Sequence, residues 1–283
     1  MVLESIIGPA KAEQRPWEMV VIGFLYTTVA VFLSLWVFEE HASLVMIFLS
    51  SMAAIPLFYR TVAYEENKHL SALTERSLLY EHSKAFLFLM CLFLGAVIAF
   101  SLWYLVLPQE TTQRLFSAQA QTIISLNQKV TGNFAQVDIM TKIFLNNVKV
   151  MIFCIIFSFL YGTGAIFILM WNASVIGVAF GNFFRVKLAE AAASLGFATF
   201  SSYLYVAAYS ILRYAIHGVP EILAYVIAGL AGGIISVAVI RHDLGTKNFE
   251  RIILDASDLI LLAVAVLVFA AILEVYVTPL VVH

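Results

Sequence analysis

Long apolar runs separated by short polar stretches dominate the chain. A helix needs about 20 predominantly apolar residues to cross the hydrocarbon core of a bilayer. Runs of this kind occur at 17–38, 42–58, 85–107, 195–216, 221–240 and 259–276, and a longer one covers 143–184. The pattern therefore predicts an all-α protein, a polytopic bundle of transmembrane helices.

The run at 143–184 is too long for a single crossing, and Gly162-Thr163-Gly164 divides it. A glycine-rich break at membrane depth is tolerated only where protein or a cavity shields the backbone. We therefore expect neighbouring spans to cover this break. Two alternatives remain for the segment: two full spans, or one span followed by a re-entrant half-helix.

The distribution of basic residues favours the second alternative, because cytoplasmic loops carry an excess of Lys and Arg. Lys11 and Arg15 place the N-terminus in the cytoplasm. With one crossing and one dip in 143–184, the chain makes seven net crossings, and 11 of its 16 Lys and Arg residues are cytoplasmic. With eight crossings, only 7 of these 16 residues are cytoplasmic. We predict seven net crossings of the plasma membrane, with the C-terminus outside.

The polar stretches divide the chain into three parts. Residues 1–63 are predicted to form an N-terminal transmembrane hairpin that turns at Glu39-Glu40-His41. Residues 64–84 are charged with apolar positions at helical spacing, which predicts a cytoplasmic linker helix or a docking surface for a soluble partner. Residues 85–283 form the membrane domain. Its outer polar loop, 108–142, is expected to contain one or two amphipathic helices, broken near Gly132.

Composition supports a membrane protein and excludes several other classes. Of 283 residues, 62% are hydrophobic and 12% are charged, about half the charged fraction of a soluble domain. The net charge of −2 lacks the basic excess of a nucleic-acid-binding protein, so the lipid bilayer is the partner that the composition implies. Cys91 and Cys154 lie in apolar runs, where they are expected to act as small core residues.

Polar residues within apolar runs are functional candidates, because burying them in a membrane is expensive. The asparagines among them are expected to bond across helices and lock the broken segment. Glu274 is predicted to point into the bundle, as a structural tie or as an ion or proton site; the alternative is that it reaches out to the headgroups. The candidates are Asn146, Asn147, Lys149, Asn172, Arg213, His217, Glu221 and Glu274, and Glu274 is expected to approach Lys149, Arg213, His217 or one of the asparagines.

The segment 217–221 is predicted to be the outer turn between two spans. Gly218 suits the left-handed residue after a helix end, and Pro220 suits the first position of a new helix. Glu221 then lies in a first turn, where the helix dipole favours negative charge. The alternative for His217 and Glu221 is a proton relay or ion site.

Glycines at a spacing of four residues mark two seams for close helix packing. They are Gly177 with Gly181, and Gly229 with Gly233. Both seams are expected to pack inside the chain, with a homo-oligomer contact as the alternative. Gly162 and Gly164 are the other candidate packing glycines.

The chain contains none of the common catalytic motifs. It has no nucleotide-binding glycine loop, no His-Glu-x-x-His pair and no Gly-x-Ser-x-Gly elbow. We therefore predict a protein that is not an enzyme, with no catalytic residue, metal site or cofactor.

An ordered set of short motifs resembles the stage II sporulation protein M family over residues 84–283. The motifs are Asn146-Asn147-Val148-Lys149, Gly162-Thr163-Gly164, Asn172 with Gly177 and Gly181, His217-Gly218-Val219-Pro220-Glu221, Ala228-Gly229-Leu230-Ala231-Gly232 and Glu274-Val275-Tyr276-Val277-Thr278-Pro279. The N-terminal Pro16-Trp17-Glu18 and Ile55-Pro56-Leu57 are similar to archaeal members.

The resemblance implies a membrane scaffold, because the family member in sporulating bacteria anchors peptidoglycan-degrading partners during engulfment. The predicted function is therefore a non-enzymatic scaffold that assembles membrane or soluble partner proteins. The alternative is a transport or permease-like component with a polar site in the outer half of the bundle.

Overall fold

The computed structural model describes residues 15–71, 75–130, 136–161, 164–195, 199–240 and 246–281. All regular structure in these ranges is helical, which confirms the all-α class. The elements are α2 (Glu18–Val37), η2 (Glu39–His41), α3 (Ala42–Ser71), α4 (Glu75–Val106), α5 (Gln109–Leu115), α6 (Ser117–Val130), α7 (Gln136–Tyr161), α8 (Ala165–Leu195), α9 (Phe200–Ile240), α10 (Lys247–Ile272), η3 (Leu273–Val277) and α11 (Thr278–Val281).

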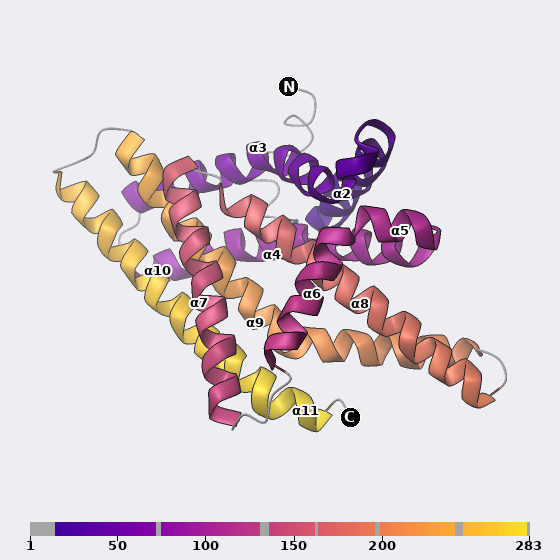
Figure 1. Ribbon diagram of the computed structural model, residues 1–283. Helices are drawn as coiled ribbons and strands as arrows, with labels where there is room; N and C mark the ends of the chain where they lie inside the picture. The colour runs from indigo at the N-terminus through magenta and orange to yellow at the C-terminus, as the bar shows by residue number, and fades with distance from the viewer. Residues whose placement is uncertain are drawn as a thin grey trace.

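Seven helices in the described part of the chain are long and apolar enough to cross a membrane: α2, α3, α4, α7, α8, α9 and α10. They form two groups. α2, α3 and α4 pack on one another, α7 and α10 pack on α9, and α8 contacts both groups. Figure 1 shows the second group as a fan of helices, with α8 passing α6 and continuing beside the first half of α9. The prediction of a polytopic bundle is thus confirmed.

The contact between α2 and α4 depends on two glycines that face each other's helices. A Cβ at Gly23 would collide with the backbone of Leu92, and one at Gly95 with the backbone of Val20. Because neither residue has a side chain, the two backbones approach closely, which is how membrane helices gain van der Waals contact.

Two short helices of the outer polar loop are attached to the start of α3. Ser43 Oγ donates to Gln119 Oε1 at 3.0 Å and accepts from the Ala118 amide at 3.1 Å. Arg114 of α5 pairs with Glu39. The loop therefore contains two helices, as predicted, and they are fixed against the bundle; Gly132 lies outside the described residues.

The charged stretch 64–84 does not form a separate linker helix in the described residues. Instead α3 passes through Pro56 and continues to Ser71, and α4 begins at Glu75. Pro56 lies inside this helix, as prolines of membrane helices can where neighbouring helices pack on them, and α8 and α9 both contact α3.

The break within 143–184 is present, but the segment is divided into two long helices. α7 ends at Tyr161 and α8 begins at Ala165, so Gly162 and Thr163 lie outside the described residues. A Cβ at Gly164 would lie 2.7 Å from the Cβ of Phe157, so the end of α7 covers this glycine. Both helices are long enough to cross, which favours two full spans over one span and a dip.

The predicted hairpin at 217–221 is wrong. α9 is a single helix of 41 residues that includes Gly218, Pro220 and Glu221. The residues that suggested caps do not end the helix, because Gly and Pro are tolerated inside membrane helices, where neighbouring helices and side chains satisfy the backbone groups that a proline frees. Pro220 instead bends the helix, and Figure 1 shows α9 changing direction near its middle.

Candidate intramembrane polar site

The centre of the candidate site is a hydrogen bond between two residues one turn apart on α9. The hydroxyl of Tyr225 donates to Glu221 Oε1 at 2.7 Å. Tyr225 is completely buried, whereas Glu221 is half-buried. A buried tyrosine hydroxyl needs a partner, and the carboxyl group four residues earlier provides it. The pair therefore orients the Glu221 side chain at the point where α9 enters the core.

A second carboxyl group approaches this pair from the last part of the chain. Glu274 is half-buried on η3, a π-helix that interrupts the path from α10 to α11. It lies close enough to Glu221 for the two carboxyl groups to interact electrostatically. Single-turn π-helices are rare and occur often at functional sites, where the widened turn redirects side chains.

His217 connects α9 to the same widened turn through Thr278. The Thr278 hydroxyl donates to the carbonyl oxygen of Leu273 at 3.0 Å, and His217 Nδ1 lies 3.2 Å from that hydroxyl oxygen. Because the hydroxyl has one proton to donate, this geometry assigns the remaining hydrogen bond to an Nδ1–H donor of His217. His217, Glu221 and Glu274 therefore form one polar cluster between α9 and the C-terminal helices.

The other predicted site residues are placed elsewhere. Arg213 stacks on the ring of Phe183, 4.8 Å from its centroid. Asn172 donates to the carbonyl oxygen of Ile168 in its own helix, so the prediction that it bonds across helices is wrong. A short amide side chain within a helix reaches the carbonyl one turn back more easily than a neighbouring helix.

On α7, Asn147 is buried, whereas Asn146 and Lys149 are exposed. Within the described residues, Glu274 has no hydrogen bond or ion pair with Lys149, Arg213, His217 or an asparagine. The expected inward direction of Glu274 holds in part, because the side chain is half-buried. Its neighbour is the carboxyl group of Glu221, another of the candidate polar residues.

The two glycine seams pack inside the chain. A Cβ at Gly177 would lie 2.7 Å from the Cβ of Phe100, and one at Gly181 would meet the Tyr104 ring, so this seam joins α8 to α4. In the second seam, a Cβ at Gly229 would lie 2.7 Å from the Cβ of Ala165. Gly233 is buried in the same part of α9. Gly177, Gly181 and Gly229 therefore act in internal packing, as expected.

Three residues that the sequence analysis did not select complete the site or its frame. Tyr225 follows Glu221 by one turn, and this spacing was a usable signal. For Thr278 the spacing gives no such signal, because the role of this residue depends on η3. Arg185 donates to the carbonyl oxygens of Tyr104 and Leu105 at the end of α4, the second at 3.2 Å. Basic side chains are favoured at such a helix end.

Two carboxyl groups, a tyrosine hydroxyl and an imidazole within a helix bundle have the chemistry to hold a proton or a small cation. In the described part of the chain, no group of three or more His, Cys, Asp or Glu residues is placed to hold a metal ion.

The fold and this cluster define a multi-span α-helical membrane protein with polar groups inside its bundle. The family model described as Stage II sporulation protein M (SpoIIM) matches residues 84–279, which is more than half of the chain. The chain belongs to this family. Comparisons with curated proteins and with solved structures find no match. The N-terminal hairpin lies outside the matched residues, so its archaeal resemblance stays a prediction.

Proposed function

We propose that this protein is a non-enzymatic scaffold of the plasma membrane that holds partner proteins on the outer side of the bilayer. The observation that carries the proposal is an arm formed by 186–195 of α8 and 200–216 of α9. It extends past the part of the bundle that a bilayer covers, and much of its surface is apolar and aromatic.

The length of α9 supports a position of the arm outside the hydrocarbon core. α9 has 41 residues, about 60 Å at 1.5 Å per residue, whereas the hydrocarbon core is about 30 Å thick. The half of α9 from Glu221 to Ile240 lies in the core of the bundle and is long enough to cross alone. Arg185 contacts the end of α4 and marks the same boundary on α8.

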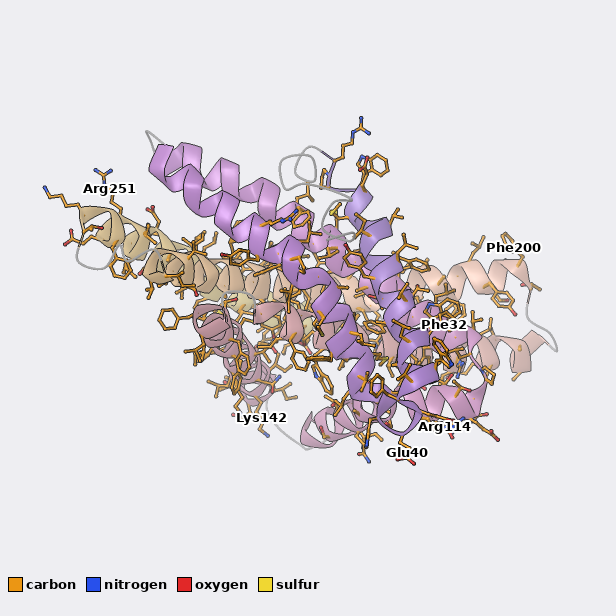
Figure 2. The ribbon with its side chains drawn as sticks, turned by 90° about the horizontal axis from the view of Figure 1, so that it is seen from above. Phe32, Glu40, Arg114, Lys142, Phe200 and Arg251 are labelled. Carbon is orange, nitrogen blue, oxygen red and sulfur yellow. The ribbon has the colours of Figure 1, made fainter. Side chains whose placement is uncertain are left out.

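The arm exposes large side chains that its two helices leave uncovered. The exposed fraction is 78% for Phe200, 69% for Tyr205 and 57% for Leu204. Figure 2 shows Phe200 at one extreme of the molecule and Arg251 near the other. Apolar patches of this kind, rich in aromatic residues and poor in charge, are typical of protein–protein interfaces. The partner that we expect is therefore a protein with an apolar surface just outside the membrane.

The proposed orientation puts the N-terminus in the cytoplasm. With α7 and α8 both crossing and α9 crossing once, nine of the 16 Lys and Arg residues lie on the cytoplasmic side. Single-cysteine labelling in intact cells tests this. A cysteine at Ser117 is expected to react from outside and one at Thr246 only after permeabilisation; the opposite result would reverse the orientation.

A second candidate function is transport of protons or cations, which the proximity of Glu221 and Glu274 favours. Both carboxyl groups lie in helices that are apolar enough to span the membrane. Flux into liposomes that contain the purified protein separates the two functions. A scaffold shows the same flux as empty liposomes. A flux that Glu274→Gln abolishes, while the melting temperature is unchanged, would replace the scaffold with transport.

A further inference from the structure

Lys149 is an exposed basic residue in the middle of a candidate membrane span. The span covers Val137–Leu160, so Lys149 lies about 18 Å from one end and about 16 Å from the other. These distances are more than twice the length of a four-carbon side chain, so the ammonium group does not reach the headgroups simply by extending. A charge at this depth requires a compensating group.

The helix geometry shows that Lys149 points away from the rest of the bundle. The buried face of α7 contains Asn147, Met151, Cys154 and Ser158, which recur at intervals of three and four residues. Lys149 follows Asn147 by two residues, a rotation of about 200° around the helix axis, which places it opposite that face. In Figure 1 α7 lies at the front of the bundle, where no other helix covers it.

Asn146 lies on the same side, one turn before Lys149, and is also exposed. Among the residues that the structure describes, neither side chain has a hydrogen bond or an ion pair. The asparagine side chain is too short to reach the headgroups, so lipid leaves its amide unsatisfied. A hydrocarbon surface is therefore a poor environment for both residues.

We propose that Asn146 and Lys149 form a docking seam for a membrane-spanning helix of a partner protein, which presents a carboxylate to them. A carboxylate between the two residues would accept from the Asn146 amide and from the Lys149 ammonium group, and so satisfy both. This inference deepens the scaffold function proposed above and rests on it, but it uses a different surface, within the membrane.

Charge excludes a second copy of the chain as the occupant. Two copies inserted in the same orientation would pair α7 with α7 in parallel about a two-fold axis. That arrangement would bring the two Lys149 ammonium groups together in a region of low dielectric, where like charges repel strongly. An acidic side chain of a different helix is the complementary partner.

The test uses a synthetic single-span peptide of Leu and Ala with one Glu at the depth of Lys149. A matched peptide has Gln at that position. Full-length protein in phosphatidylcholine vesicles receives a donor dye at Thr141→Cys, after alanine replaces Cys91 and Cys154. Energy transfer to an acceptor on each peptide then measures binding at increasing peptide-to-lipid ratios.

We expect the Glu peptide to bind more tightly than the Gln peptide, and Lys149→Leu to abolish the difference. Interhelical polar contacts in membranes predict a loss of about three- to eighteenfold. Lys149→Arg retains the preference, and Lys247→Leu, a change of an exposed lysine on α10, serves as the matched control. Unchanged melting temperatures show that the variants fold.

Equal binding of the two peptides would overturn the proposal. A second result would also overturn the proposal. If phosphatidylglycerol added to the vesicles binds at Lys149 and abolishes the preference for the Glu peptide, the seam is a site for a lipid headgroup. Neither result depends on the arm formed by α8 and α9. Failure of the docking seam can therefore be distinguished from failure of the scaffold function.

Discussion

The two halves of α9 have opposite surroundings. Residues 221–240 lie in the centre of the bundle, and nearly all of them are buried. Residues 200–219 pack on α8 along Ser202, Val206 and Ser210 and expose their other faces. The buried half contains three glycines and one aromatic residue, whereas the exposed half contains one glycine, Phe200 and four tyrosines. Glycines therefore mark the half that occupies the centre, and aromatic side chains mark the half that projects.

The physical reason is that lipid and protein interior are equally apolar. Apolar character therefore gives a membrane helix no preference for a central position. Small residues do, because they let neighbouring backbones approach, and at Gly232 a Cβ would lie 2.6 Å from the carbonyl oxygen of Ile155 on α7. The comparison predicts that equivalent substitutions in the two halves have different effects.

The largest difference is expected for a leucine at two glycines of α9. Gly232→Leu forces the backbone of α7 away and is expected to destabilise the fold by about 3 kcal/mol. Gly218→Leu serves as the control, because nothing lies within 4 Å of a Cβ at that position. Thermal unfolding in detergent measures both. Equal melting temperatures for the two variants would show that the halves are packed alike.

A smaller difference is expected for removing one hydroxyl group. Tyr225→Phe leaves the carboxyl group of Glu221 without its hydrogen bond, which is expected to cost about 1–2 kcal/mol. Tyr205→Phe changes an exposed residue of the arm and is expected to stay within about 0.5 kcal/mol of the parent. Chemical unfolding of both variants provides the comparison; a neutral Tyr225→Phe would mean that the pair does not support the core.

The smallest effect is a gain in stability at Gly218. Since Gly218 lies inside a helix with open space around it, Gly218→Ala is expected to stabilise the protein by about 0.5–1 kcal/mol. A turn at 217–221, as the sequence suggests, requires the opposite sign, because alanine is poor in the left-handed region. The direction of the shift in melting temperature distinguishes the two structures.

This position illustrates what the sequence predicts and what it does not. Apolar runs predict the spans, since crossing a bilayer constrains length and composition strongly, and Gly162-Thr163-Gly164 predicts the break before Ala165. Gly218 and Pro220 mislead because their meaning as caps comes from soluble proteins, whereas both residue types are tolerated inside membrane helices. Inside a bundle the same residues continue a bent helix.

The candidate site was predicted in part for a similar reason. Glu221, His217 and Glu274 stand out as polar residues in apolar runs, and the structure brings them together. Arg213 and Asn172 have the same signature but lie apart from this cluster: Arg213 stacks on Phe183 of α8, and Asn172 bonds to Ile168 of its own helix. The pairing of Glu274 with Glu221 depends on η3, and a local change of helix type leaves no pattern in a single sequence.

The scaffold function is tested most directly on complexes purified in native lipid from cells that express the full chain. Wild type is compared with Leu204→Ser/Tyr205→Ser, which makes the arm polar without touching the bundle. Mass spectrometry of the complexes gives their composition. We expect a defined partner protein to copurify with the wild type and to be absent from the variant. The melting temperatures of the two proteins are expected to be equal. The same composition for both proteins, or a chain that carries no partner in either, would contradict the scaffold function.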